Sequence, residues 1–410
     1  MKTIIRSSIG ILMLVLLFQC EKEKTIINVK IPDDNFLYAL IERGIDINGD
    51  SLISTAEAEN VRKLDVSYCS ISDMKGIEAF VNLDTLSCNN NHLTSLDVSR
   101  NIHLKVLYCF FNQLTDIDVS TCTLLHYFNC NTNDLTNIDI TKNTELKGFK
   151  CDNNQISDLD VSHNPSLDFL SFSRNLITSI DISKNPLLET LYCYQNQLSD
   201  LNVSNNLLLN ELYCSGNLLT SLDVTANTEL TLLYFGNNQL TSIDISNNTL
   251  LTNLECSGQV LSNFNEISNH TALTLLSCPD CQLTSLDVTN MTNLKFLDCN
   301  RNQLTTLNVS NNSAMIRLEC EGNLLTSLDV SNLYNLRILN CGGNQLTSLD
   351  ISNNTSLGHG YENTSNIFLS INDMPDLQQV CVWTLPFPPV HFHLYKSGSP
   401  NVYFTTSCSK

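Results

Sequence analysis

Residues 83–101 have the sequence LDTLSCNNNHLTSLDVSRN, and the same pattern of apolar and polar residues recurs along most of the chain. From Leu86 to Leu339 the position of Leu86 recurs every 21 residues, apart from one step of 22 near residues 265–266. A sequence that repeats at a short fixed period predicts a stack of equal structural units. We therefore expect one solenoid of about fourteen turns, including a divergent first turn at Leu64, rather than several globular domains.

Each repeat has the alternation of a strand with one buried face. Leu86 and Cys88 are separated by a single residue, and the alternation returns ten residues later in Leu96-Asp97-Val98. No part of a repeat has helical spacing. The sequence thus predicts parallel strands, either in two regular sheets or in one good sheet opposite a more irregular face. Turns about 4.8 Å apart would build a rod roughly 65–70 Å long.

Asparagine and cysteine recur at fixed places in the repeat. Asn91 and its equivalents follow the first strand segment, where an inward amide can pair with turn groups, and a second series begins at Asn101. Eleven of the 17 cysteines share one inward position with Phe172 and Phe235. A position that accepts either residue needs an apolar filler, so we expect free buried thiols there. Their stacked Cβ atoms should also lie too far apart for disulfides. The eleven are Cys88, Cys109, Cys130, Cys151, Cys193, Cys214, Cys256, Cys278, Cys299, Cys320 and Cys341.

The other cysteines follow separate patterns. Cys69, Cys122 and Cys281 fall on asparagine positions, so we expect no redox or zinc role for the Cys278-Pro-Asp-Cys281 segment. Cys381 and Cys408 lie outside the repeats and can pair in an oxidising compartment.

The N-terminus has the pattern of an export signal. Lys2 and Arg6 precede a short apolar run that ends at Phe18, and Cys20 follows at once. This arrangement resembles the lipid-attachment site of bacterial lipoproteins, although Gln19 departs from the small residue preferred there. It implies a signal peptide over 1–19, lipid on Cys20 and a tether over 20–30. The alternatives are an uncleaved N-terminal anchor and a lone cysteine in a signal that is cut elsewhere.

Residues 31–60 differ from the repeats and should cap the first turn. A short helix is expected to about Arg43, followed by an acidic loop that resembles an EF-hand calcium loop. The resemblance implies one bound Ca²⁺, although Ser51 replaces the expected glycine. The alternative is an acidic turn that caps the solenoid without metal. The ligands it implies are Asp46, Asn48, Asp50, the carbonyl of Leu52, Ser54 and Glu57.

The repeat pattern L-x-x-L-x-C-x-x-N-x-L resembles the leucine-rich-repeat family, which is of α/β class although these repeats are β-dominated. With IPDDNF at 31–36, the acidic loop and the tail from Met374 to Phe404, the layout resembles internalin-like surface proteins of the Bacteroidetes type. The resemblance implies a solenoid over 61–354, an irregular C-terminal cap over 355–410 and a surface-exposed outer-membrane lipoprotein. Contact with the membrane is expected only through the lipid anchor.

Outward-facing positions carry the functional signal. The net charge of −20 and the lack of a basic stripe exclude nucleic-acid binding. Aromatic side chains gather on the outer side of the first strand segment, which favours binding of a protein or glycan ligand. The alternative is cross-strand packing that only stabilises the sheet. The candidate binding residues are Tyr108, Phe110, Tyr127, Tyr192, Tyr194, Tyr213 and Tyr234.

The opposite face carries a stripe of aspartates that includes Asp97 and Asp118. We expect this stripe to be a solvated surface, with weak binding of cations or basic peptides as the alternative. A hydrolytic enzyme is disfavoured because the histidines occupy unrelated repeat positions. The sequence therefore predicts a non-catalytic binding protein, with a structural or assembly role in the cell envelope as the second hypothesis.

Overall fold

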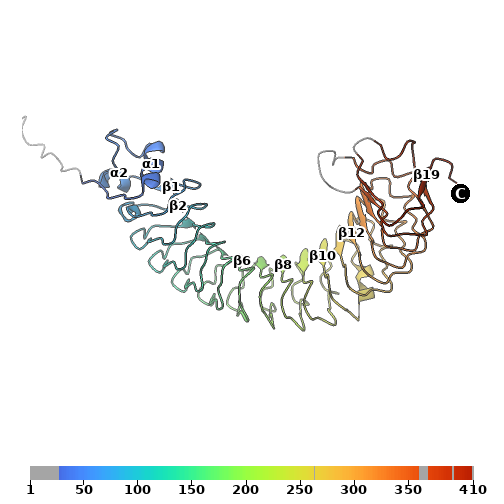
Figure 1. Cartoon of the computed structure of the whole chain (residues 1–410). Coiled ribbons are helices and arrows are strands. Elements are labelled where there is room, and N and C mark those ends of the chain that lie inside the picture. Colours follow the sequence, from blue (N-terminus) through green and yellow to red (C-terminus); the bar gives the residue numbers. More distant parts are fainter. Residues whose placement is uncertain (1–26, 263, 360–367, 390–391, 409–410) are drawn as a thin grey trace, which may run out of the picture.

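The computed structural model describes residues 27–262, 264–359, 368–389 and 392–408. The expected signal peptide and Cys20 lie outside these ranges. The described chain forms one curved solenoid, with a small helical cap at the N-terminal end (Figure 1). This confirms the predicted leucine-rich-repeat fold, with parallel strands and few helices.

A parallel sheet of 16 strands runs the length of the solenoid. From β1 to β14 consecutive strands pair in register, so that Leu86 of β2 pairs with Leu107 of β3. The strands are β1 (Lys63–Asp65), β2 (Thr85–Ser87), β3 (Val106–Tyr108), β4 (Tyr127–Asn129), β5 (Gly148–Lys150), β6 (Phe169–Ser171), β7 (Thr190–Tyr192), β8 (Glu211–Tyr213), β9 (Leu232–Tyr234), β10 (Asn253–Glu255), β11 (Leu275–Ser277), β12 (Phe296–Asp298), β13 (Arg317–Glu319), β14 (Ile338–Asn340), β16 (Leu369–Ser370) and β18 (Leu394–Tyr395).

The C-terminal tail continues this sheet, so the solenoid has about sixteen turns instead of about fourteen. Leu369 of β16 pairs with Leu339, and Leu394 of β18 pairs with Leu369. These steps of 30 and 25 residues break the 21-residue period, which is why the sequence pattern missed the two turns. A second sheet forms on the opposite face from β15 (Ser348–Asp350), β17 (Gln379–Cys381) and β19 (Tyr403–Thr405). The described chain has no other paired strands, apart from an isolated antiparallel bridge between Asn28 and Ser54.

The solenoid is curved into an arc, whereas the sequence period led us to expect a rod (Figure 1). The main sheet lines the concave side of the arc (Figure 1). Strands on that side are held at the spacing of a hydrogen-bonded sheet, about 4.8 Å. The opposite side consists mostly of turns without such pairing, so successive turns can spread there and the stack bends toward the sheet.

Two asparagine ladders hold successive turns together. In the first ladder, the Asn175 amide donates to the carbonyls of Cys151 and Phe172, while its oxygen accepts from the Ile156 amide at 3.0 Å. In the second ladder, Asn185 donates to two carbonyls of the preceding turn, but its buried oxygen has no partner in the described structure. The structural role predicted for both asparagine series is therefore confirmed.

The first ladder comprises Asn91, Asn112, Asn133, Asn154, Asn175, Asn196, Asn217, Asn238, Asn302, Asn323 and Asn344, and the second comprises Asn101, Asn143, Asn164, Asn185, Asn206, Asn227, Asn248, Asn312 and Asn354.

The N-terminal cap covers the first turn with apolar side chains. Helix α1 (Asp34–Glu42) begins where the Asp33 carboxylate accepts from the Phe36 amide, and it buries Phe36 and Leu40. Helix α2 (Thr55–Glu59) begins at a reciprocal pair of hydrogen bonds between Ser54 and Glu57. Two short 3-10 helices, η1 (Ile77–Ala79) and η2 (Phe264–Asn269), interrupt the repeats. In the described chain no helix is long and apolar enough to cross a membrane.

Candidate functional site

The candidate site is a strip of aromatic side chains on the concave face, which we call the aromatic strip. In each strand the central residue is buried in the core, and the residues on either side of it face out. The strip extends over β3 to β9, all of which except β5 contribute an aromatic side chain, from the N-terminal arm to the middle of the arc (Figure 1). It consists of Tyr108, Phe110, Tyr127, Phe169, Tyr192, Tyr194, Tyr213 and Tyr234.

The tyrosines of β7, β8 and β9 pack closely on one another. The ring centroids of Tyr192 and Tyr213 lie 4.5 Å apart with an interplanar angle of 65°, and those of Tyr213 and Tyr234 lie 4.4 Å apart at 55°. All three side chains are half-buried. Their rings thus use part of their surface to stabilise the sheet, and the part that is still exposed remains available to a ligand.

Burial and the neighbouring Glu211 carboxylate raise the pKa values of Tyr192 and Tyr213. The Tyr192 hydroxyl donates to the Glu211 carboxylate at 2.5 Å. Burial and this hydrogen bond raise the pKa of Tyr192 above its usual value. Burial and the neighbouring Tyr234 raise the pKa of Tyr213 to about 12. The middle of the strip therefore presents neutral hydroxyl groups at physiological pH.

Phe169 joins the two halves of the strip, and sequence reasoning missed it. Its ring centroid lies 5.4 Å from that of Tyr192. The signal was present, since Phe169 directly precedes the inward Leu170 and occupies the same outward position as Tyr127. Gly148 and Lys150, which flank the inward Phe149 on β5, hold the corresponding outward positions and were also missed.

Two open hollows lie along the strip. The first has a volume of about 330 Å³ and lies around Gly148, between Tyr127 and Phe169. The second has a volume of about 530 Å³ and lies beside Tyr194, Tyr213 and Tyr234. All seven aromatic residues predicted from the sequence line one of the hollows or pack on a residue that does.

The aspartate stripe on the opposite face has a local structural role. Asp118 accepts from the backbone amide of Ser120 at 2.8 Å, and Asp139 accepts from both the amide and the hydroxyl of Thr141. These hydrogen bonds hold the pKa values of both carboxyl groups below their usual range. Each aspartate thus fixes the turn that follows it.

The acidic loop of the N-terminal cap forms a compact turn. The Asp46 carboxylate accepts from the backbone amides of Gly49, Asp50 and Ser51. The Glu57 carboxylate accepts from the amides of Ile47 and Ser54, and these hydrogen bonds outweigh burial and lower its pKa.

Oxygen donors suited to calcium are therefore present in this loop, but its carboxylates do not close on one point. In the described chain, the only group of three acidic, cysteine or histidine ligand atoms within 4.8 Å of one another lies elsewhere.

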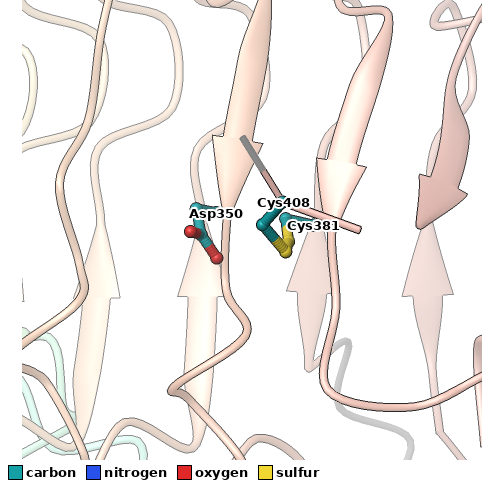
Figure 2. A group of neighbouring side chains, drawn as sticks. All are labelled: Asp350, Cys381 and Cys408. Atoms are coloured by element: carbon teal, nitrogen blue, oxygen red, sulfur yellow. A yellow bond between two sulfur atoms is a disulfide. The ribbon is translucent and has the colours of Figure 1, made fainter. Parts of the chain in front are cut away.

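That group consists of Asp350, Cys381 and Cys408 (Figure 2). Cys381 at the end of β17 and Cys408 after β19 form a disulfide, beside the Asp350 carboxylate on β15. With both sulfur atoms bonded to each other, no thiolate is left for a metal. The bridge fastens the last strand of the second sheet to the strand before it.

The eleven stacked cysteines are free and buried in the core. Burial raises the pKa of the Cys88 and Cys341 thiols to about 12, so both are inert at neutral pH. Cys281 occupies a first-ladder position, with its sulfur 3.2 Å from the Cys256 carbonyl. The Cys278-Pro-Asp-Cys281 segment therefore joins a core position to a ladder position.

One surface contact has the composition of a catalytic triad but lacks its geometry. Nδ1 of His163 lies 3.1 Å from the Ser162 hydroxyl and 3.9 Å from the Asp160 carboxylate. Both partners thus meet the same ring nitrogen, whereas a triad needs one nitrogen for the nucleophile and the other for the orienting acid. This exposed trio cannot act as a serine nucleophile relay.

Solved structures from Listeria monocytogenes resemble the whole solenoid. The functional domain of Internalin J, described as including a cysteine ladder, is 34% identical with a TM-score of 0.77; the match covers 87% of this chain and 78% of that one. The internalin InlF is 24% identical with a TM-score of 0.64, over 80% of this chain and 94% of that one.

Among curated proteins, Internalin J of L. monocytogenes serotype 4b is 37% identical over 70 residues. That stretch is 17% of this chain and only 8% of the length of Internalin J. No family model matches the chain.

Proposed function

The chain belongs to the internalin-like leucine-rich-repeat proteins, and from that premise we propose that it is a non-catalytic surface protein that recognises a protein or glycan ligand. The proposed binding surface is the aromatic strip on the concave face. A role in adhesion or recognition follows from this surface.

The observation that carries the proposal is the gathering of partly exposed aromatic side chains on six of the seven consecutive strands β3 to β9. Tyr127 is 45% exposed, and Tyr192, Tyr213 and Tyr234 are half-buried. Exposed apolar patches of this kind mark interaction sites in soluble proteins, and tyrosine is enriched in such sites. Mutual packing explains part of the row, but it does not explain the open hollows beside it.

Binding tests should compare the two faces of the solenoid. The purified protein would first be applied to arrays of extracellular-matrix proteins and glycans to find a ligand. Tyr213→Ala and Tyr234→Ala should then weaken binding by about 2 kcal/mol each, as loss of an interface anchor does. Isothermal titration of the ligand into each variant measures the change.

Asp223→Asn on the opposite face is the matched control. It keeps the acceptor that holds Thr225, as Asn202 does for Ser204 in another turn, while it removes one charge. Melting temperatures of all variants separate lost binding from lost stability. If the aspartate variant loses affinity and the tyrosine variants keep it, the binding surface is on the other face.

A structural or assembly role in the cell envelope is the second candidate. The main sheet ends at β18 and the second sheet at β19, and neither has a further strand beside it in the described chain. Sheet edges can pair with other chains. Self-association of the purified protein, with no binding to any arrayed ligand, would favour this role.

We propose further that the protein is exported and held at the outer membrane by lipid on Cys20, with residues 1–19 removed. The charged start, the short apolar run and the cysteine that follows support this step. Labelled fatty acid should be incorporated by the wild-type protein in cells and not by Cys20→Ala. Equal labelling of the two proteins would contradict lipid attachment at this residue.

One calcium ion in the acidic loop of residues 46–57 is also proposed. Asp46, Asn48, Asp50, the Leu52 carbonyl, Ser54 and Glu57 would hold it. The ion would fix the loop between α1 and α2. It would not contact the proposed ligand, because this loop lies in the N-terminal cap and the aromatic strip lies on β3 to β9.

A further inference from the structure

The aromatic strip has one gap, at Gly148 of β5. The same outward position holds Tyr127 on β4 and Phe169 on β6, which are the register partners of Gly148. A Cβ atom at Gly148 would lie 3.0 Å from Cδ1 of Tyr127. Glycine therefore lets Tyr127 approach the strand and leaves the space in front of β5 open.

Aromatic side chains form most of the wall of the hollow that results. Tyr108 and Phe110 lie on one side of Gly148, and Phe169 lies on the other. The volume of about 330 Å³ is at the small end of the range for ligand pockets. Such a hollow has room for one large apolar side chain. Few of the groups that line it could hydrogen-bond a sugar ring.

Lys150 adds an unpaired positive charge to this apolar hollow. Its ammonium group lies 4.5 Å from the ring centroid of Phe169, and the side chain is half-buried. No carboxylate of the described chain forms an ion pair with it. The nearby Asp152 instead accepts from the Ser171 hydroxyl at 2.5 Å and the Ser173 amide at 2.7 Å.

None of the lysines in the described chain forms an ion pair, and Lys150 differs from the others because its ammonium group lies over an aromatic ring. A cation beside an aromatic ring at a hollow can accept an incoming anion without first losing an existing ion-pair partner. The hollow and Lys150 together select a ligand with an apolar body and a negative charge next to it.

We propose that this hollow binds an acidic segment of a partner polypeptide, with one aromatic or large aliphatic side chain inserted over Gly148 and a neighbouring carboxylate on Lys150. The proposal rests on the proposed function, because it names the ligand class for one part of the aromatic strip. A polypeptide fits better than an anionic glycan because aromatic surface, rather than hydrogen-bonding groups, dominates the walls.

A displayed library of random heptapeptides, selected on the purified full-length protein, tests the ligand class. The enriched peptides should carry an aromatic or large aliphatic residue next to Asp or Glu. A synthetic copy of the most enriched peptide and its Asp/Glu-to-amide version are then titrated by calorimetry. The amide version should bind about fivefold more weakly, the range of a partly exposed ion pair.

Lys150→Met should weaken binding of the acidic peptide by the same factor and leave the affinity for the amide peptide unchanged. Lys147→Met, an exposed lysine outside the hollow on the same turn, is the control for net charge and should have little effect. Gly148→Val should reduce binding of both peptides, because its side chain fills the hollow. Lys150→Met keeps the test valid if the valine variant does not fold.

Four results would overturn the inference. They are enrichment of neutral or basic peptides, no enrichment at all, equal affinity of the wild-type protein for the acidic and amide peptides, and binding of a sulfated hexasaccharide in place of any peptide. The proposed function would survive these results if a protein ligand were weakened by Tyr213→Ala and Tyr234→Ala and not by Gly148→Val or Lys150→Met.

Discussion

At the scale of single residues, asparagine does two different jobs in each turn. Asn175 of the first ladder uses its whole amide, with three donated hydrogen bonds and one accepted. Asn185 of the second ladder uses only its two donors. This difference fits the substitutions in the chain, since the second ladder position also holds apolar residues at Met291 and Leu333.

Asn175→Ala should therefore destabilise the protein more than Asn185→Ala. Its loss leaves the Ile156 amide without a partner, and such a buried amide costs about 1–3 kcal/mol, while Asn154 and Asn196 still donate to the carbonyls of Cys151 and Phe172. Thermal unfolding followed by circular dichroism gives the comparison. The midpoints of the melting curves are compared without conversion to free energies of unfolding, because a repeat protein need not unfold in two states.

Asn185→Leu, which copies Leu333, is the matched control and should resemble Asn185→Ala. If the first-ladder variant melts at or above the temperature of the second-ladder variant, the unequal use of the two amides does not govern stability.

The sequence predicted single residues correctly where a repeat position has the same surroundings in every turn. The period placed Cys88 and its equivalents in the core, and burial there is complete. It could not show that Tyr192, Tyr213 and Tyr234 pack on one another at 4.4–4.5 Å, because that depends on rotamers across three strands. Nor could it show that the absence of a side chain at Gly148 creates a hollow.

At the scale of elements, the N-terminal cap contains the proposed calcium loop between α1 and α2. Calcium at several millimolar should raise the melting temperature, because an ion that binds only the folded loop stabilises the folded state. The expected affinity is that of extracellular modules, on the order of 10⁻⁴–10⁻³ M. Differential scanning calorimetry with and without calcium measures the shift.

Asp50→Asn is the variant of choice for this loop, since its amide can still accept from the Leu52 backbone amide. It should abolish the calcium-dependent shift with little change in the melting temperature without calcium. If several millimolar calcium does not shift the melting temperature of the wild-type protein, the loop is a metal-free acidic turn.

Elements outside the 21-residue period were the hardest to predict. The helix at 34–42 was expected from the sequence, but α2 was not, because five residues give too little helical periodicity. Strands β16 and β18 were missed because the turns before them are longer than the repeat. They form because Leu369 and Leu394 still continue the row of Leu339.

At the scale of the whole molecule, the aspartate stripe makes stability depend on pH. Hydrogen bonds from the following Ser or Thr lower the pKa values of these aspartates in the folded state, as for Asp97 and Asp287. A group with a lowered folded pKa stabilises the fold above its unfolded value of about 3.9, and this stability is lost as the pH falls through the folded pKa.

The melting temperature should therefore fall as the pH decreases below about 4, where protonation begins to compete with these hydrogen bonds. A triple variant, Asp118→Asn, Asp139→Asn and Asp160→Asn, should lose less on acidification, because an amide keeps the acceptor without a proton to gain. Asn308 already holds Ser310 in this way. Identical acid profiles for the variant and the wild type would contradict this role of the stripe.

The disulfide between Cys381 and Cys408 also has a mechanical consequence. A solenoid loaded along its axis can release one turn at a time, and each turn of 21 residues would add about 70 Å of extended chain. The bridge closes a segment with a sequence separation of 27, so this end resists unravelling when the chain is pulled from its C-terminal side. If Cys20 holds the cell and the aromatic strip holds the ligand, the load passes through the turns before β9. The turns beyond β9 then carry no force. Only turns in the N-terminal half can unfold under the load and lengthen the chain.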